Sequence, residues 1–344
     1  MQRIRTLDLA RGFTVLLIAP IHSMLVYGSL SLRDHFFTRF LAFIAEWQGA
    51  QVFMLAMGLS VSFSSKTRFL PVIKRSMLLL VAAMVLNLFK FVLPYYFHWI
   101  PKEMLNELDP QPDSHTPLKL FLIIDILPFA AAANLILWLV QITSKRPLLP
   151  FLLALIVCLS APLFWDLHSS HPYMDFFLQF LGGHPPQVFF PLSSWLVYPL
   201  AGMGMGRFIR QWGEYKTLAF AYLPGSLLFL TGLLANDLSN PMNPYGFYRS
   251  LPFETMEHLG AILIGISFWN WISRKINDSS VFHLFEYCSG HITRIYLIQW
   301  PLICWLLPLF GFQDLNLIPA LLAMSFVTLS TLTISIYIHA KQIH

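Results

Sequence analysis

Arg11 and His22, the residues of the first apolar stretch that could do chemistry, stand eleven residues apart. At about 100° per residue in a helix, this spacing places both side chains on one face, about 16 Å apart. A neutral imidazole can take a proton from an amine or a hydroxyl near neutral pH. A guanidinium is always charged and makes several hydrogen bonds, so Arg11 suits a phosphate or a carbonyl oxygen. The pair therefore predicts a reaction site along one helix face.

Asp8 lies on the same face and leaves a second interpretation open. It can pair with Arg11 at positions i and i+3 as a brace at the start of the helix, and His22 can be a hydrogen-bonded packing residue. Polar groups inside a membrane-length helix are costly unless they face a protein interior or a wet cavity. They usually mark a pathway or a reaction site, but the residues alone leave both interpretations open.

The composition places the chain in a membrane. Hydrophobic residues make up 56% of it, charged residues 11%, and the mean hydropathy is +0.62, a balance that excludes an ordinary soluble domain. The net charge of +5 comes from basic residues scattered among short connections, so it indicates membrane topology and not nucleic-acid binding. The three cysteines have no metal-ligand spacing, so we expect neither a disulfide framework nor a metal.

Runs of about 17 to 25 mostly apolar residues predict about ten transmembrane helices. Lys and Arg gather in alternate connections, which places both termini in the cytoplasm by the positive-inside rule. We therefore expect an all-α polytopic integral membrane helical bundle that forms a single domain over residues 1–344, located in a bacterial inner (plasma) membrane. The predicted centres of the spans are Leu17, Leu55, Ala83, Ala131, Ile156, Pro199, Phe229, Ile264, Ile303 and Val327.

The first helix resembles that of a known group of membrane enzymes. The run from Leu7 to Gly12, Leu-Asp-Leu-Ala-Arg-Gly, with His22 following, resembles the signature of the transmembrane acyltransferases. This group comprises acyltransferase-3 proteins and heparan-α-glucosaminide N-acetyltransferase-like membrane proteins. The stretches from Phe190 to Arg207 and from Tyr296 to Ile303 agree with it, although many relatives have histidine in place of Gln299. The resemblance implies acyl-CoA as co-substrate and a catalytic role for His22.

Three further residues are candidates for binding the acyl donor. Arg207 ends a series of alternating glycines and could contact a phosphate, although the glycines themselves favour close helix packing. Arg294 is expected near the cytoplasmic end of its span. Gln299 is expected somewhat deeper, where it could reach a pantetheine amide or bond to a neighbouring helix.

Other polar and aromatic residues are candidates for supporting roles. Asp125, expected several residues inside a span, could orient His22 or Arg11, or pair with Asn87 or Lys90 of the third span. Glu257 and His258, with Glu254, could bind sugar hydroxyls or cap a helix. Lys90 is expected to snorkel toward the interface. Aromatic residues of the outer side could stack on a sugar or anchor the interface: Trp47, Trp99, Tyr173 and Tyr245.

The sequence thus predicts an acyltransferase that moves an acyl group, most simply acetyl, from cytoplasmic acyl-CoA to an amine or hydroxyl of a sugar or glycan outside. His22 would act as general base or would itself carry the acyl group. A transporter or flippase, or an inactive relative, remains an alternative. The expected partners are acyl-CoA, a glycan acceptor, membrane lipid and, in a homo-oligomer, a second copy of the chain, with no nucleic acid.

Overall fold

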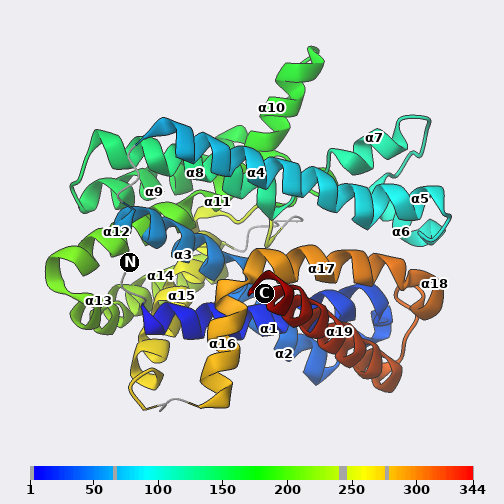
Figure 1. Cartoon of the computed structure of the whole chain (residues 1–344). Helices are drawn as coiled ribbons and strands as arrows, with labels where there is room; N and C mark the ends of the chain where they lie inside the picture. Colours follow the sequence, from blue (N-terminus) through cyan, green and yellow to red (C-terminus); the bar gives the residue numbers. More distant parts are fainter. Residues whose placement is uncertain (1–3, 65–67, 240–245, 276–278, 344) are drawn as a thin grey trace. The chain divides into compact units, whose positions relative to one another are not determined.

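The computed structural model describes residues 4–64, 68–239, 246–275 and 279–343. These residues form helices joined by short connections, and no strand occurs within those ranges (Figure 1). The helices are α1 (Arg5–Tyr27), η1 (Leu30–Leu32), α2 (Phe36–Gln48), α3 (Ala50–Phe63), α4 (Phe69–Asn87), η2 (Leu88–Val92), α5 (Leu93–Tyr96), α6 (Lys102–Leu108), α7 (Thr116–Phe121), α8 (Ile126–Thr143), α9 (Leu148–Ser160), η3 (Ala161–Phe164), α10 (Pro172–Gly182), α11 (Leu192–Trp195), α12 (Val197–Trp212), α13 (Glu214–Phe220), α14 (Tyr222–Ser239), α15 (Pro252–Ile272), α16 (Ser280–Gly290), α17 (Ile292–Trp305), α18 (Leu307–Phe310) and α19 (Leu317–Ile343).

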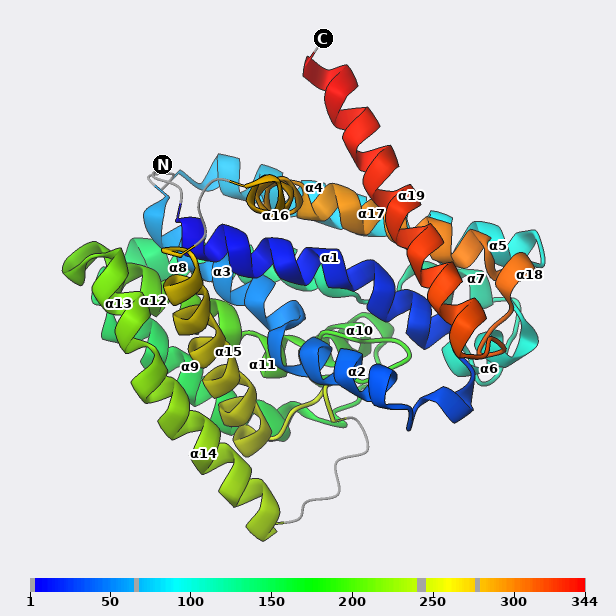
Figure 2. The same ribbon diagram turned by 90° about the horizontal axis from the view of Figure 1, so that it is seen from below.

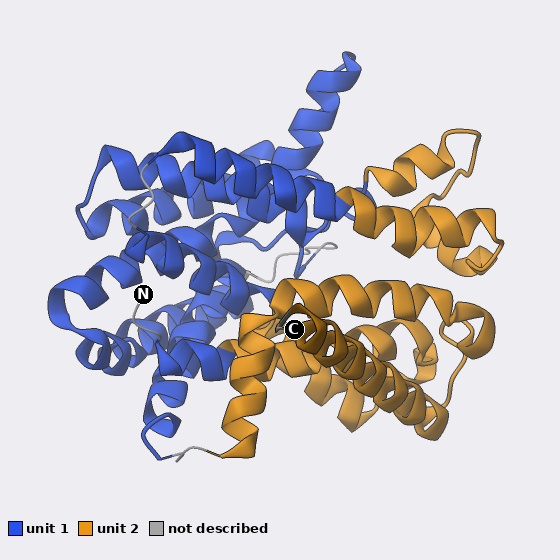
Figure 3. Cartoon of the chain, in the orientation of Figure 1, with its two compact units in different colours: residues 1–10, 50–83, 123–277 blue, residues 11–49, 84–122, 278–344 orange. Residues whose placement is uncertain are grey.

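The chain divides into two compact units (Figure 3). Unit 1 comprises residues 1–10, 50–83 and 123–277, and unit 2 comprises residues 11–49, 84–122 and 278–344. Each unit combines segments from distant parts of the sequence, so neither is a contiguous domain. That the whole chain works as one domain stays a prediction.

Six helical stretches are long and apolar enough to cross a bilayer. They are residues Arg5–Tyr27, Phe36–Phe63, Phe69–Tyr96, Ile126–Thr143, Glu214–Leu238 and Leu317–Gln342. All the predicted span centres nevertheless fall within helices, the remaining ones in α9, α12, α15 and α17. The all-helical membrane class is therefore confirmed, whereas the number of about ten spans stays a prediction.

Unit 1 contains a close helix pair, α3 and α12. A Cβ atom at Gly202 would overlap the carbonyl oxygen of Leu55, and one at Gly206 would overlap the hydroxyl of Ser62. The glycines therefore allow the two backbones to touch, as small residues do in membrane helix pairs. This confirms packing as the role of the alternating glycines.

Unit 2 contains most of α1 together with α16, α17 and α19. Figure 2 shows α1 as one long helix, followed after a short turn by α2. Against α16, Gly12 is in backbone contact, because a Cβ atom there would overlap the carbonyl of Phe285. Near the other end of α1, the Tyr27 hydroxyl donates a hydrogen bond of 2.7 Å to the carbonyl of Ile303 in α17. These contacts fix which face of α1 packs against α16 and α17.

Candidate active site

His22 is held between two consecutive residues of α17. The amide Nε2 of Gln299 lies 3.0 Å from Nδ1 of the imidazole. The Trp300 ring stacks on the same imidazole, with ring centroids 4.3 Å apart and an angle of 29° between the planes. Gln299 is fully buried and His22 is half-buried. The histidine that the sequence singled out therefore has a fixed ring plane and a fixed partner on one nitrogen.

Lys90 brings a positive charge to the same cluster. Its ammonium lies 3.6 Å from the centre of the Trp300 ring and 4.6 Å from that of Phe91, within the range of cation–π attraction. The residue is only 4% exposed, so the prediction that it snorkels to the interface is wrong. It belongs to η2, a π-helical turn, and such turns are frequent at functional sites.

Both helices that carry the cluster contain a proline beside it. Pro20 lies inside α1, near His22, and Pro301 lies inside α17, directly after Trp300. A proline has no N–H, so it removes one hydrogen bond from the helix ladder and can bend the helix. Each helix continues through its proline but lacks one backbone N–H donor there, close to the imidazole.

Arg11 lies in the same helix as His22, as predicted. The helix is continuous from Arg5 to Tyr27, so the two side chains share a face at about 16 Å along the axis. The guanidinium is partly buried, next to the backbone contact of Gly12 with Phe285. Arg11 and the imidazole thus stand at two levels of one helix.

Comparison with known families decides which class of protein this arrangement belongs to. A family model of the acyltransferase-3 group, described as "Acyltransferase domain", matches residues 4–340. The chain belongs to the acyltransferase-3 family. No curated protein and no solved structure shows a significant match to it. The resemblance predicted from the first helix is confirmed, and the protein is a membrane acyltransferase.

Two of the residues predicted to bind the acyl donor of this acyltransferase lie on unit 2. Gln299 contacts His22, so of its two interpretations the structure shows a bond to a neighbouring helix. Arg294 donates a hydrogen bond from Nη2 to Oε1 of Gln342 in α19. Contact of either residue with a donor stays a prediction.

Arg207, the third candidate, belongs to α12 in unit 1, and its guanidinium contacts the end of α8. It is buried and donates hydrogen bonds to the carbonyl oxygens of Arg146 and Val140, at 2.8 and 3.1 Å, and to Oε1 of Gln141 at 3.2 Å. A cation is favourable at this helix end, where the last carbonyls lack intrahelical partners. Burial, together with the charges of Arg207 and Arg210, lowers the pKa of Lys145 in the following connection.

Asp125 is not inside a helix, contrary to the prediction. It is the N-cap of α8, in extended conformation, and its carboxylate accepts a hydrogen bond of 2.7 Å from the N–H of Ile126. The helix starts later than hydropathy indicates because Ile124 pairs with Val188 in an isolated bridge. Asp125 belongs to unit 1, whereas His22 belongs to unit 2.

The supporting candidates divide between the two units. Asp8 is buried in α1, at the end that belongs to unit 1. The Glu257 carboxylate accepts a hydrogen bond of 3.1 Å from Asn236, and His258 follows it in α15. Trp47 in unit 2 packs its ring against Phe43. Tyr245 lies outside the described residues.

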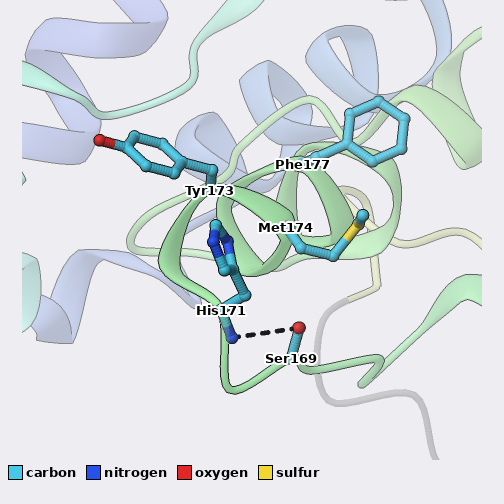
Figure 4. A pocket seen from close by; sticks show the side chains of 5 residues that line it. All are labelled: Ser169, His171, Tyr173, Met174 and Phe177. Atoms are coloured by element: carbon cyan, nitrogen blue, oxygen red, sulfur yellow. Dashed lines mark hydrogen bonds between the residues drawn. The ribbon is translucent and has the colours of Figure 1, made fainter.

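Helix α10 projects from the rest of unit 1 (Figure 1). The sequence predicts that the loop containing it lies on the outer side of the membrane. An open depression of about 510 Å³ at the first turns of α10 is lined by Ser169, His171, Tyr173, Met174 and Phe177 (Figure 4). Tyr173 is 84% exposed there. Its ring contacts that of His171, with centroids 5.6 Å apart, and its exposure suits stacking on a ligand and an interfacial position equally.

Sequence reasoning missed one structural arginine. Arg249 is 2% exposed and donates hydrogen bonds to the carbonyls of Gly182 and Gly183 and, at 3.0 Å, to Asp166. It thereby ties the segment before α15 to the end of α10. An arginine in a loop rich in glycine and proline gives no periodic signal, so only the fold reveals it. Among the described residues, no group of three or more His, Cys, Asp or Glu side chains could hold a metal ion.

Proposed function

We propose that this acyltransferase moves an acyl group, most simply acetyl, from cytoplasmic acyl-CoA to an amine or hydroxyl of a sugar on the outer side of a bacterial inner membrane. The observation that carries the proposal is the fixed imidazole of His22, stacked on Trp300 and bonded to Gln299. A general base must be held in a defined orientation, and these two contacts provide it. The proposal includes about ten spans and cytoplasmic termini, which follow from the apolar runs and the distribution of Lys and Arg.

In the proposed reaction, His22 removes the proton from the attacking amine or hydroxyl. The nitrogen or oxygen of the acceptor then forms a bond with the carbonyl carbon of the thioester, and a tetrahedral intermediate results. The C–S bond breaks, the sulfur leaves with its electron pair, and the imidazolium returns the proton to it, which gives free CoA thiol. Arg11, about 16 Å nearer the cytoplasmic end of α1, would hold the phosphates of the donor.

The test is acyl transfer by purified protein in vesicles supplied with labelled acetyl-CoA and a mixture of glycan acceptors. We expect His22→Ala to lose transfer while it folds and binds the donor as the wild type does. His283→Ala is the matched control, because that histidine lies on the surface of α16 with a side chain that is 68% exposed. Undiminished transfer by His22→Ala would end the proposal, and substrate uptake without CoA would favour a transporter.

A further inference from the structure

The amide of Gln299 has one satisfied atom and one unsatisfied atom. Its Nε2 lies 3.0 Å from Nδ1 of His22, while its Oε1 is buried and has no hydrogen-bond partner among the described residues. Gln299 is fully buried. A polar atom without a partner in such a place is unfavourable, so the orientation of the amide has consequences for the imidazole beside it.

A neutral imidazole carries its proton on one nitrogen, and the partner of the other nitrogen decides which one. When Nε2 of Gln299 faces Nδ1 of His22, Nδ1 accepts and the proton of the imidazole is on its Nε2. That form cannot take a proton at Nε2. Rotation of the amide by 180° exchanges its oxygen and nitrogen. Oε1 then accepts from Nδ1–H, and the imidazole carries its lone pair on Nε2.

The plane of the imidazole is restricted by its neighbour in α17. Trp300 is stacked on it, with the centroids 4.3 Å apart, and a stacked ring keeps its plane. Because Trp300 follows Gln299 directly in α17, one turn of one helix sets both the plane of the imidazole and the partner of Nδ1. Rotation of the Gln299 amide changes the group presented to Nδ1 and leaves the imidazole in this plane.

We propose that Gln299 is the positioning residue of the reaction, which selects the tautomer of His22 by presenting Oε1 to Nδ1–H when His22 acts as base. The inference rests on the proposed function for its kinetic consequence. Its structural part, the position of the proton on His22, does not depend on the identity of donor or acceptor. Gln299 acts through His22 and need not touch the substrate.

The test compares two substitutions of similar length. Gln299→Met removes both hydrogen-bonding atoms, and we expect kcat to fall about 100-fold with unchanged KM for the donor, the loss typical of a disabled general base. Gln299→Glu has an acceptor oxygen in either orientation, and we expect it to retain kcat within about tenfold, since a base keeps most of its efficiency when its proton stays in place. Wild-type kcat in Gln299→Met, or equal loss in both variants, would overturn the proposal.

A second readout is independent of activity. Histidine ¹⁵N spectra of the full-length protein, with the His22 signals assigned by their loss in His22→Ala, report which nitrogen carries the proton. We expect the Nδ1–H form in wild-type protein with donor bound and in Gln299→Glu, and loss of that form in Gln299→Met. The same tautomer in all three proteins would contradict the inference. Failure of the wild type to transfer any acyl group would instead contradict the proposed function, whereas the spectra of Gln299→Met and Gln299→Glu, recorded without donor, would still test this inference.

Discussion

The ammonium of Lys90 lies 3.6 Å from the centre of the Trp300 ring, and that ring is stacked on the imidazole of His22. A positive charge buried beside the proposed base favours the negative charge that develops on the tetrahedral intermediate. We therefore expect Lys90→Met to lower kcat at least tenfold, within the range seen when an electrostatic contact in an active site is removed, and Lys90→Arg to retain more activity. Initial rates of acyl transfer give the comparison.

The control for this prediction is Lys74→Met, which removes an exposed lysine from α4. It should leave kcat unchanged. Equal rates for Lys90→Met and wild type would show that the Lys90 charge has no part in the reaction.

Gly12 is expected to be intolerant of a side chain. A Cβ atom there would overlap the backbone carbonyl of Phe285, and overpacking of this kind typically costs about 1–3 kcal/mol. Gly12→Ala should therefore lower the midpoint of thermal unfolding in detergent. Leu25→Ala, at a site on the same helix that is 61% exposed, is the comparison; a larger effect there than at Gly12 would refute the packing argument.

Arg249 is expected to stabilise unit 1 without a part in catalysis. Its guanidinium is buried and bonded to the carbonyls of Gly182 and Gly183 and to Asp166. Hydrogen bonds to a charged group contribute about 1.5–3 kcal/mol, so Arg249→Met should lower the free energy of unfolding by about that amount. Thermal unfolding measures this, and kcat of the folded fraction should stay at the wild-type value; a lost kcat with normal stability would contradict the assignment.

The stability of the segment from α6 to α7 should fall at low pH and again at high pH. The His115 N–H, with Lys119, lowers the pKa of Asp113 from 3.8, and Asp109, with Asp113, raises the pKa of Lys119 from 10.5. The contribution of Asp113 is thus present above its unfolded pKa and is lost as the pH falls through its folded pKa. That of Lys119 is present below 10.5 and is lost as the pH rises through its folded pKa.

Hydrogen exchange of residues 102–121, corrected for the intrinsic rate at each pH, should therefore show greatest protection between about pH 5 and pH 9. In Asp113→Asn the acid-side loss should shrink. An acid-side loss of protection that is equally large in Asp113→Asn and in the wild type would disprove the role of this carboxylate.

The first helix and its face could be predicted from the sequence, because the spacing of Arg11 and His22 is a local property of an α-helix. The partners of His22 could not. Gln299 is 277 residues away in the chain, and a glutamine in an apolar helix is equally typical of many packing contacts. The burial of Lys90 escaped prediction as well, since hydropathy does not show a π-helical turn. The sequence did contain one usable signal, an aspartate at a preferred N-cap position, which would have placed Asp125 correctly.

The contact of Gly12 with the main chain of Phe285 has a consequence for its neighbour. With two backbones touching, α1 cannot roll about its long axis at this level without a clash. The direction in which Arg11 projects from the helix is therefore set by the absence of a side chain at Gly12. Gly12 thus makes the close contact between the helices possible, and that contact fixes the direction in which Arg11 projects from α1.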